Sequence, residues 1–287
     1  MNPRRPAVDS VKGFTLVELV IVITLTGIVV VLVSTMVGRQ MLGYVDTARR
    51  ADMMGKLDIA LEQVTRDLRN AAPYSIRISS GTAVEWVPIE SWGRYRKLPD
   101  ADPDAVLDFS KPDDRFEVLY GNAMPAIPAG ARILIGNTDA MGVDGINVYG
   151  DPSGGSLVPA GSNVITPDTV TVTRSGNDLL LSPAFQFSLA SLASRFYVVT
   201  GAVSYVCSGG AIHRYGPYGI QNTQPTNAGV APLSTASDAL LVDGLSSCQF
   251  GYSAIDSQRG QLSVSLTLQD GGDSVTSTHI INIENRP

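Results

Sequence analysis

The longest apolar stretch of the chain lies close to its N-terminus. Residues 14–37 are almost entirely apolar, and Glu18 is the only charged residue among them. As a helix this stretch would be about 36 Å long, enough to cross a hydrocarbon core of about 30 Å. A lone segment in lipid must satisfy its backbone hydrogen bonds internally. The pattern therefore predicts a membrane-spanning helix with one acid near its start.

A second apolar pattern follows at helical spacing. Apolar residues recur every three or four positions with charged residues between them, at Met54, Leu57, Leu61, Val64, Leu68 and Ala71. This spacing predicts an amphipathic helix over 38–72, continuous with the first and ending before Pro73. An apolar stripe of this kind packs on its own domain or forms a seam for a partner, and we favour packing on the chain's own sheet.

From Pro73 onward the pattern changes to short alternating runs separated by turn residues. The clearest run is 262–268, where apolar and polar residues alternate strictly. We expect strands over 74–79, 84–89, 116–120, 131–135, 145–149, 170–174, 178–182, 195–207, 210–215, 247–254, 261–268 and 274–283. The predicted fold class is α+β, with one long N-terminal helix packed on antiparallel sheet in a β-rich domain over 73–287.

Four segments predict long surface loops, which often carry binding sites. They are 98–114, 121–130, 136–162 and 216–237, rich in Gly, Pro, Asn or Asp. Within the first, Asp100, Asp102 and Asp104 have the spacing that opens a calcium loop. Ala105 and Lys111 stand where an EF-hand needs Gly and Glu, so a solvated acidic loop is the preferred interpretation. We therefore expect no cofactor, with calcium as the alternative.

Charge and side-chain chemistry narrow the functional classes. The formal net charge is −6, and no basic block appears, so nucleic acid is not an expected partner. The only histidines are His213 and His279, and neither belongs to a recognisable nucleophile–base motif. We therefore do not expect an enzyme.

The two cysteines, Cys207 and Cys248, indicate the compartment of the C-terminal domain. The basic residues before the apolar run keep residues 1–12 cytoplasmic by the positive-inside tendency, which places the rest of the chain across the membrane. An even number of cysteines in that oxidising compartment favours one disulfide. Two buried free thiols are the alternative.

The junction Lys12-Gly13-Phe14-Thr15-Leu16-Val17-Glu18 carries a specific resemblance. It resembles the prepilin-type signal of type IV pilins and type II secretion pseudopilins. The resemblance implies a leader over 1–13, cleavage after Gly13 by a prepilin peptidase, and N-methylation of Phe14. It also implies that Glu18 neutralises the Phe14 amine, within one chain or on a neighbouring subunit, and so guides filament assembly. The alternative role for Glu18 is to stabilise the start of its own helix.

Residues 195–199, 203–207, 212–215 and 241–252, together with 43–52, resemble the O-type (MshO-like) minor pilins of the mannose-sensitive haemagglutinin (MSHA) pilus, and more distantly pseudopilin J of type II secretion. This implies a minor pilin acting in filament initiation, priming or tip assembly. The implied partners are the major pilin, other minor pilins, an inner-membrane platform and an assembly ATPase.

The implied location is the inner membrane, with the C-terminal domain in the periplasm or at a filament tip. The alternatives are a minor pseudopilin of type II secretion and a tip adhesin that binds a ligand through loop 98–114 or 216–237. A membrane-tethered hydrolase is disfavoured because no nucleophile–base pair is recognisable.

Overall fold

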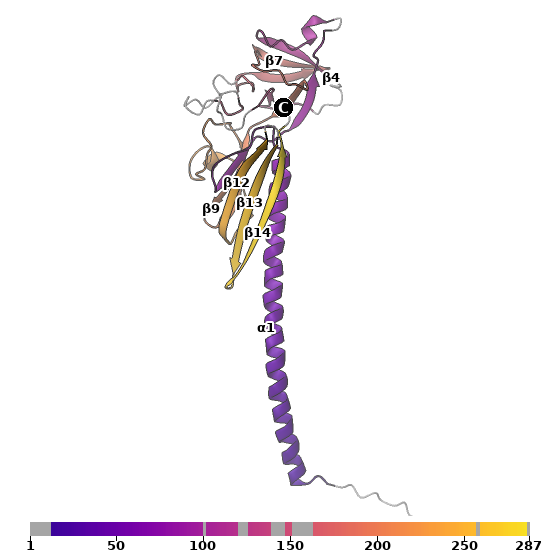
Figure 1. Cartoon of the computed structure of the whole chain (residues 1–287), viewed down its shortest axis with the longest axis vertical. Coiled ribbons are helices and arrows are strands. Elements are labelled where there is room, and N and C mark those ends of the chain that lie inside the picture. Colours follow the sequence, from indigo (N-terminus) through magenta and orange to yellow (C-terminus); the bar gives the residue numbers. More distant parts are fainter. Residues whose placement is uncertain are drawn as a thin grey trace, which may run out of the picture. The chain divides into compact units, whose positions relative to one another are not determined.

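The computed structural model describes residues 13–99, 102–119, 126–138, 147–150, 163–256 and 259–285. It forms two compact units, Met1–Asp52 and Met53–Pro287. The single long helix α1, Leu16–Arg69, contributes residues to both units. The β-rich part lies entirely in the second unit (Figure 1).

The first part of α1 satisfies its polar groups within the helix. The hydroxyl of Thr24 donates to the carbonyls of Val20 and Ile21, and the hydroxyl of Thr26 donates to Val22 O at 2.7 Å. Such back-bonding removes the cost of placing a hydroxyl in lipid. By length and composition Leu16–Val37 is able to cross a membrane, and none of this segment is buried against the rest of the chain.

The last part of α1, from Met53 onward, is amphipathic and packs within the second unit. Its fully buried side chains follow helical spacing, at Met53, Leu57, Ala60, Leu61, Val64 and Leu68. The prediction was wrong at Met54, which is 41% exposed, because the stripe continues four residues back from Leu57 to Met53. The helix ends at Arg69, and Ala71 then forms a bridge with Pro88, as expected for a helix followed by Pro73.

Fourteen strands follow α1 within the described ranges. Their bounds are β1 Arg77–Ser80, β2 Ala83–Trp86, β3 Ser91–Tyr95, β4 Asp113–Leu119, β5 Arg132–Leu134, β6 Thr171–Ser175, β7 Asp178–Phe185, β8 Arg195–Val199, β9 Ala202–Ser208, β10 Ala211–Tyr218, β11 Asp238–Val242, β12 Leu245–Asp256, β13 Arg259–Asp270 and β14 Asp273–Glu284. Short 3-10 helices cover Pro103–Ala105 and Leu233–Thr235.

These strands form three antiparallel sheets. The five-stranded sheet has the order β1-β2-β9-β10-β11, and the six-stranded sheet has the order β5-β8-β3-β4-β7-β6. The third sheet is the C-terminal meander β12-β13-β14, visible in Figure 1 with β13 in the middle. The predicted α+β arrangement of a long helix and antiparallel sheet is confirmed, with three sheets in place of one.

The main core joins the end of α1 to two of the sheets. The helical stripe packs with Trp86 and Tyr205 of the five-stranded sheet and with Leu262, Val264 and Leu266 of the meander. Burying each of these large apolar side chains contributes about 1.5–3 kcal/mol. The helix is therefore held mainly by apolar contacts with the sheets on which it packs.

One acidic side chain joins the end of α1 to the five-stranded sheet. Asp67 Oδ2 accepts hydrogen bonds from Tyr205 Oη and Arg214 Nε, each at 2.8 Å. Its other carboxylate oxygen accepts from Gln63 Nε2 at 2.9 Å. The ring of Tyr205 stacks on Trp86 with centroids 5.0 Å apart. The charge beside this apolar core is therefore paired and hydrogen-bonded through both oxygens, as burial requires.

Several strand predictions need correction. The structure adds β3 and β11, which the sequence patterns did not indicate. The predicted strand 195–207 is two strands, because the backbone turns between Val199 and Ala202, where a Cβ on Gly201 would lie 2.5 Å from Tyr218 O. The predicted strand 145–149 is a turn over its described residues 147–149, and residues 145 and 146 lie outside the described part.

Candidate processing and assembly site

The segment before α1 leaves its side chains open to solvent. Gly13 precedes the helix, and Phe14 is 81% exposed. A Cβ built on Gly13 would meet no atom within 4 Å. Nothing in the described fold therefore requires a glycine at position 13. A requirement for a small residue there must come from a partner that recognises this segment.

Thr15 is the residue that starts the helix. Its hydroxyl accepts a hydrogen bond from the Glu18 N–H at 3.2 Å, and its carbonyl accepts one from Leu19 N–H at 3.1 Å. The first bond satisfies one of the helix's unpaired N-terminal donors. Thr15-Leu16-Val17-Glu18 has the spacing of a capping box, so the sequence also indicates where the helix starts.

Glu18 lies in the first turn of α1 and is exposed along with its neighbours. Among the residues that the structure describes, no ion pair involves it. The helix N-terminus favours a nearby negative charge, which accounts for part of its placement. In the apolar segment Leu16–Val37 this carboxylate is available to a cation outside the described chain.

Cys207 and Cys248 form a disulfide, with Cα atoms 6.2 Å apart. Cys207 belongs to β9 and Cys248 to β12, so the bond joins the five-stranded sheet to the meander. The alternative of two free thiols is not what the structure contains. The bond therefore holds together the two sheets that enclose the end of α1.

The acidic loop is built around an arginine. Asp102 forms an ion pair with Arg115, whose hydrogen bond lowers the pKa of the Asp102 carboxyl. Arg115 also pairs with Asp178, and Asp104 donates its N–H to Asp102 Oδ1 at 3.0 Å. Asp100 lies outside the described residues. No group of three metal-ligating side chains occurs within the described ranges.

The two histidines lie apart, on β10 and β14. His213 Nδ1 lies 2.8 Å from Asp238 Oδ1, and the His213 ring stacks on Tyr215 with centroids 6.0 Å apart. His279 is a half-buried residue of β14 that pairs with Val264 of β13. Both histidines thus occupy ordinary strand positions in the sheets.

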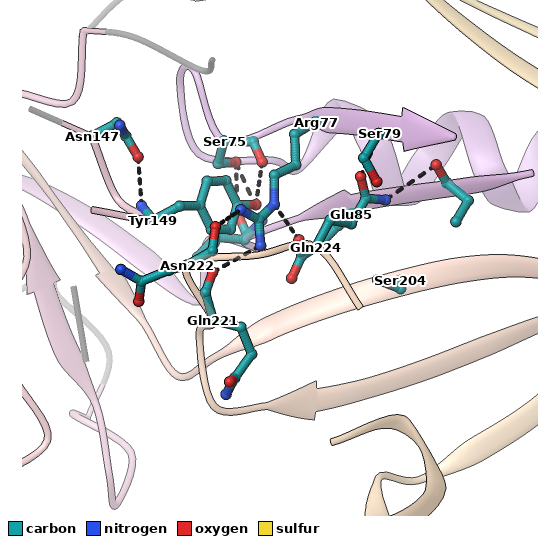
Figure 2. Close-up of polar contacts among 12 residues, drawn as sticks. Ser75, Arg77, Ser79, Glu85, Asn147, Tyr149, Ser204, Gln221, Asn222 and Gln224 are labelled. Atoms are coloured by element: carbon teal, nitrogen blue, oxygen red, sulfur yellow. Dashed lines mark hydrogen bonds and ion pairs between the residues drawn. The ribbon is translucent and has the colours of Figure 1, made fainter. Parts of the chain in front are cut away.

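Loop 219–232, within the segment predicted as a binding loop, is fixed by Arg77, whose side chain is 12% exposed. Arg77 donates to the carbonyls of Asn222 at 2.7 Å and Gln221 at 2.8 Å, and it forms an ion pair with Glu85 (Figure 2). The guanidinium lies 3.6 Å from the centroid of the Tyr149 ring. One cation thereby connects the β1–β2 hairpin, the segment 147–150 and the loop.

Glu85 is the centre of this network and is completely buried. Its second oxygen accepts from Tyr218 Oη at 2.9 Å, and Tyr218 Oη lies 2.6 Å from Ser204 Oγ. Burial raises the pKa of the Glu85 carboxyl, and the adjacent Arg77 opposes that rise. No motif in the sequence indicates this site, because its members lie far apart along the chain.

The loop is also held by the side-chain amide of Gln224, which forms hydrogen bonds with the backbone of the β1–β2 hairpin. Gln224 Oε1 accepts from Ser79 N–H at 2.6 Å, and Gln224 Nε2 donates to Ala83 O at 3.1 Å (Figure 2). Both partners are backbone groups of the β1–β2 hairpin. These two hydrogen bonds therefore fix the candidate binding loop to the hairpin at Gln224.

Comparison with known proteins bears on the N-terminal segment. Residues 9–34 match the family model of the prokaryotic N-terminal methylation motif. Searches of curated proteins and of solved structures returned no match. The matched segment contains Gly13, Phe14 and Glu18 and most of the apolar stretch 14–37. The chain therefore carries the N-terminal motif of type IV pilin-like proteins, together with an apolar helix that fits a single-pass inner-membrane anchor and antiparallel sheet packed on the end of that helix.

Proposed function

We propose that the protein is a minor pilin of an MSHA-like type IV pilus, processed by a prepilin peptidase, and that it acts in filament initiation, priming or tip assembly. The observation that carries this proposal is the placement of Glu18. It is the one charge in the exposed apolar stretch 14–37, which begins directly after Gly13. A carboxylate in lipid is costly unless it is paired, so this position calls for a cation on another subunit or at the chain's own new N-terminus.

The expected partners follow from the same motif. A pilin-like chain implies other pilins and a pilus assembly machinery. The more specific partners of this proposal are the major pilin, other minor pilins, an inner-membrane platform and an assembly ATPase. The late motifs over 195–252 favour the MSHA-like pilus over type II secretion. The genes adjacent to the coding sequence would distinguish the two systems.

Processing gives the first prediction. In a strain with an active prepilin peptidase, intact-mass measurement should show loss of residues 1–13 and one added methyl group on Phe14. Gly13→Leu should abolish cleavage, because the peptidase site requires a small residue. The fold offers open space at this Cβ, so the variant should keep the melting temperature of the unprocessed parent. A full-length wild-type chain in such a strain would refute the proposal.

Assembly gives the second prediction. Glu18→Ala should leave cleavage and membrane insertion intact and should reduce recovery of the protein in sheared filaments by about tenfold or more, as expected for loss of one desolvated charge pair. Glu62→Ala, which removes an exposed carboxylate from the soluble part of the same helix, is the matched control and should assemble normally. Equal recovery of Glu18→Ala and the parent would contradict a charge-pairing role.

A tip adhesin is a second candidate, and one observation favours it. Arg77 and Gln224 hold loop 219–232 in a fixed conformation, and a preorganised loop loses less entropy on binding a ligand. Specific retention of the purified full chain on a glycan array, lost when the loop is replaced by a short glycine linker, would favour this role.

A further inference from the structure

We propose that the outer face of β3, β4 and β8 binds a glycan residue that carries one carboxylate, a sialic or uronic acid. The site consists of Trp92, Arg94, Leu119 and Arg195, and it does not include loop 219–232. The inference goes beyond both candidate functions and depends on neither of them. It starts from two arginines that face each other on adjacent strands with no acid between them.

The residues of this site share one face of the six-stranded sheet. Arg94 of β3 lies opposite Arg195 of β8 on one side and opposite Leu119 of β4 on the other. Trp92 comes two residues before Arg94, so its side chain lies on the same face. The alternate residue Phe196 is fully buried on the opposite face, which packs on the core. The arginines and the tryptophan therefore form one row on the outer side of the sheet.

Neither Arg94 nor Arg195 forms an ion pair with an acid among the residues that the structure describes. Other arginines in or beside this sheet do have an acidic partner: Arg96 pairs with Glu117, Arg115 with Asp102, and Arg132 with Asp168. Like charges directly opposite each other on adjacent strands are destabilising. A carboxylate held by both guanidinium groups would replace this repulsion with charge-assisted hydrogen bonds.

Trp92 provides an apolar surface beside the two arginines. Its side chain is 59% exposed, and Leu119 is 37% exposed. Within the described ranges, no aromatic ring or cation stacks on the Trp92 indole. The negative face of an indole attracts the C–H groups of a sugar ring. Positions 92 and 94 are about 7 Å apart along the strand, so a ring on Trp92 places its carboxylate beside Arg94.

Two acids limit how much negative charge the ligand can carry. Glu90, two residues before Trp92, accepts a hydrogen bond from Thr200 Oγ1 at 3.1 Å. Glu117, two residues before Leu119, already has its own ion pair. A nucleic acid or an acidic peptide would bring further anions toward these carboxylates, which would repel them. A single carboxylate on an otherwise neutral glycan avoids this repulsion.

The extent of the site also favours a sugar residue over a protein. A stable protein interface uses about 20–30 residues on each side, far more than this row contains. Aromatic side chains with a few well-placed polar groups are typical of sites that bind small ligands. On an open sheet face, such a site is accessible to the end of a long glycan from solvent.

The test is biolayer interferometry of the full chain in a nonionic detergent. The immobilised probes are lactose, and lactose capped with sialic acid or with glucuronic acid. The parent should bind at least one capped sugar about tenfold or more tightly than lactose. Arg94→Gln and Arg195→Gln should each raise the dissociation constant about tenfold or more, since each removes a hydrogen bond to a charged group. Lys97→Gln removes an exposed cation near the site and should bind like the parent.

Arg94→Glu distinguishes loss of the ligand from loss of the fold. Its carboxylate would lie opposite Arg195 and would take the place of the carboxylate of the ligand. This variant should therefore lose binding to the capped sugars. Its melting temperature should rise by about 1–3 °C, because an opposite-charge pair replaces a like-charge pair across the strands.

Three binding results would overturn the proposal. They are equal binding of the parent to lactose and to both capped sugars, tighter binding to polyglutamate or to oligothymidylate than to the capped sugars, and the same loss in Lys97→Gln as in Arg94→Gln. A lower melting temperature of Arg94→Glu would also overturn it, because Arg94 would then be required by the fold. Binding is measured on the purified chain, so the result is independent of whether the chain enters a filament.

Discussion

Replacing Glu85 with alanine should lower the free energy of unfolding by about 3–5 kcal/mol, because it leaves Arg77, whose side chain is only 12% exposed, without its counter-ion. Glu85 is fully buried, and within the described part of the chain the other groups around the Arg77 guanidinium are two loop carbonyls and the Tyr149 ring. Thermal or urea unfolding of the full chain in detergent would measure the loss. Limited proteolysis should show faster cleavage in loop 219–232, since Arg77 binds this loop to the β1–β2 hairpin.

Glu85→Gln is the matched variant, because it removes the charge and keeps the shape and one of the two acceptor oxygens. It should cost less than alanine, since the amide still offers an acceptor to Arg77 or Tyr218. Equal losses for the two variants would mean that the unpaired cation, which both variants leave, dominates over the cavity that only alanine creates. No loss in either variant would contradict the central place of Glu85 in the network.

The difference in stability between the parent and Glu85→Gln should depend on pH through the pKa of Glu85. Burial raises that pKa above its ordinary value of 4.5, so the folded state binds the proton more tightly than the unfolded state. The resulting contribution to stability is fully present below pH 4.5 and is lost as the pH rises through the raised pKa. Relative to Glu85→Gln, which does not titrate at this position, the parent should therefore gain stability as the pH falls toward 4.5.

Loss of the Cys207–Cys248 disulfide should cost about 4 kcal/mol by the chain-entropy model, because the bond closes a loop over a sequence separation of 41 residues. This is a large share of a typical domain stability of about 5–15 kcal/mol. The bond ties the meander to the five-stranded sheet, and both enclose the end of α1. Reduction should therefore lower the melting temperature and expose the 208–247 region to protease, first in its loop rather than in β10 or β11.

The Cys207→Ala/Cys248→Ala variant separates this effect from other effects of the reductant. Its melting temperature should match that of the reduced parent and should not change when reductant is added. Cleavage after Gly13 should be normal in both the parent and the double variant, because recognition of that site depends on the residues around it. Two reactive thiols in the denatured but unreduced parent would show that the disulfide does not form.

The N-terminal segment 1–72 was predictable because its signals are local. A continuous apolar run can only be helical in lipid, and the spacing of Leu57, Leu61, Val64 and Leu68 fixes the buried face of a helix. The processing motif is likewise a short linear pattern. The strict alternation over 262–268 predicted the central strand of the meander, since each inward residue is apolar.

Features that depend on contacts between distant parts of the chain were not predictable by the same reasoning. β3 and β11 have mixed patterns and exist because neighbouring strands offer them hydrogen bonds. The break at Gly201 depends on the close approach of Tyr218, which is distant in sequence. Whether Met53 or Met54 is buried depends on where the sheets lie around the helix, since both fit the spacing.

The apolar span, its lone acid, the N-terminal methylation motif and the class of fold could all be predicted from the sequence, because each depends on residues adjacent along the chain or at one fixed spacing. The folded chain was needed to show that Cys207 links two sheets, that Arg77 and Glu85 bind a distant loop, and that no described strand pairs with the outer side of β14. These features depend on which strands become neighbours. The pairing of strands depends on long-range burial and hydrogen bonding, which a local sequence pattern does not indicate.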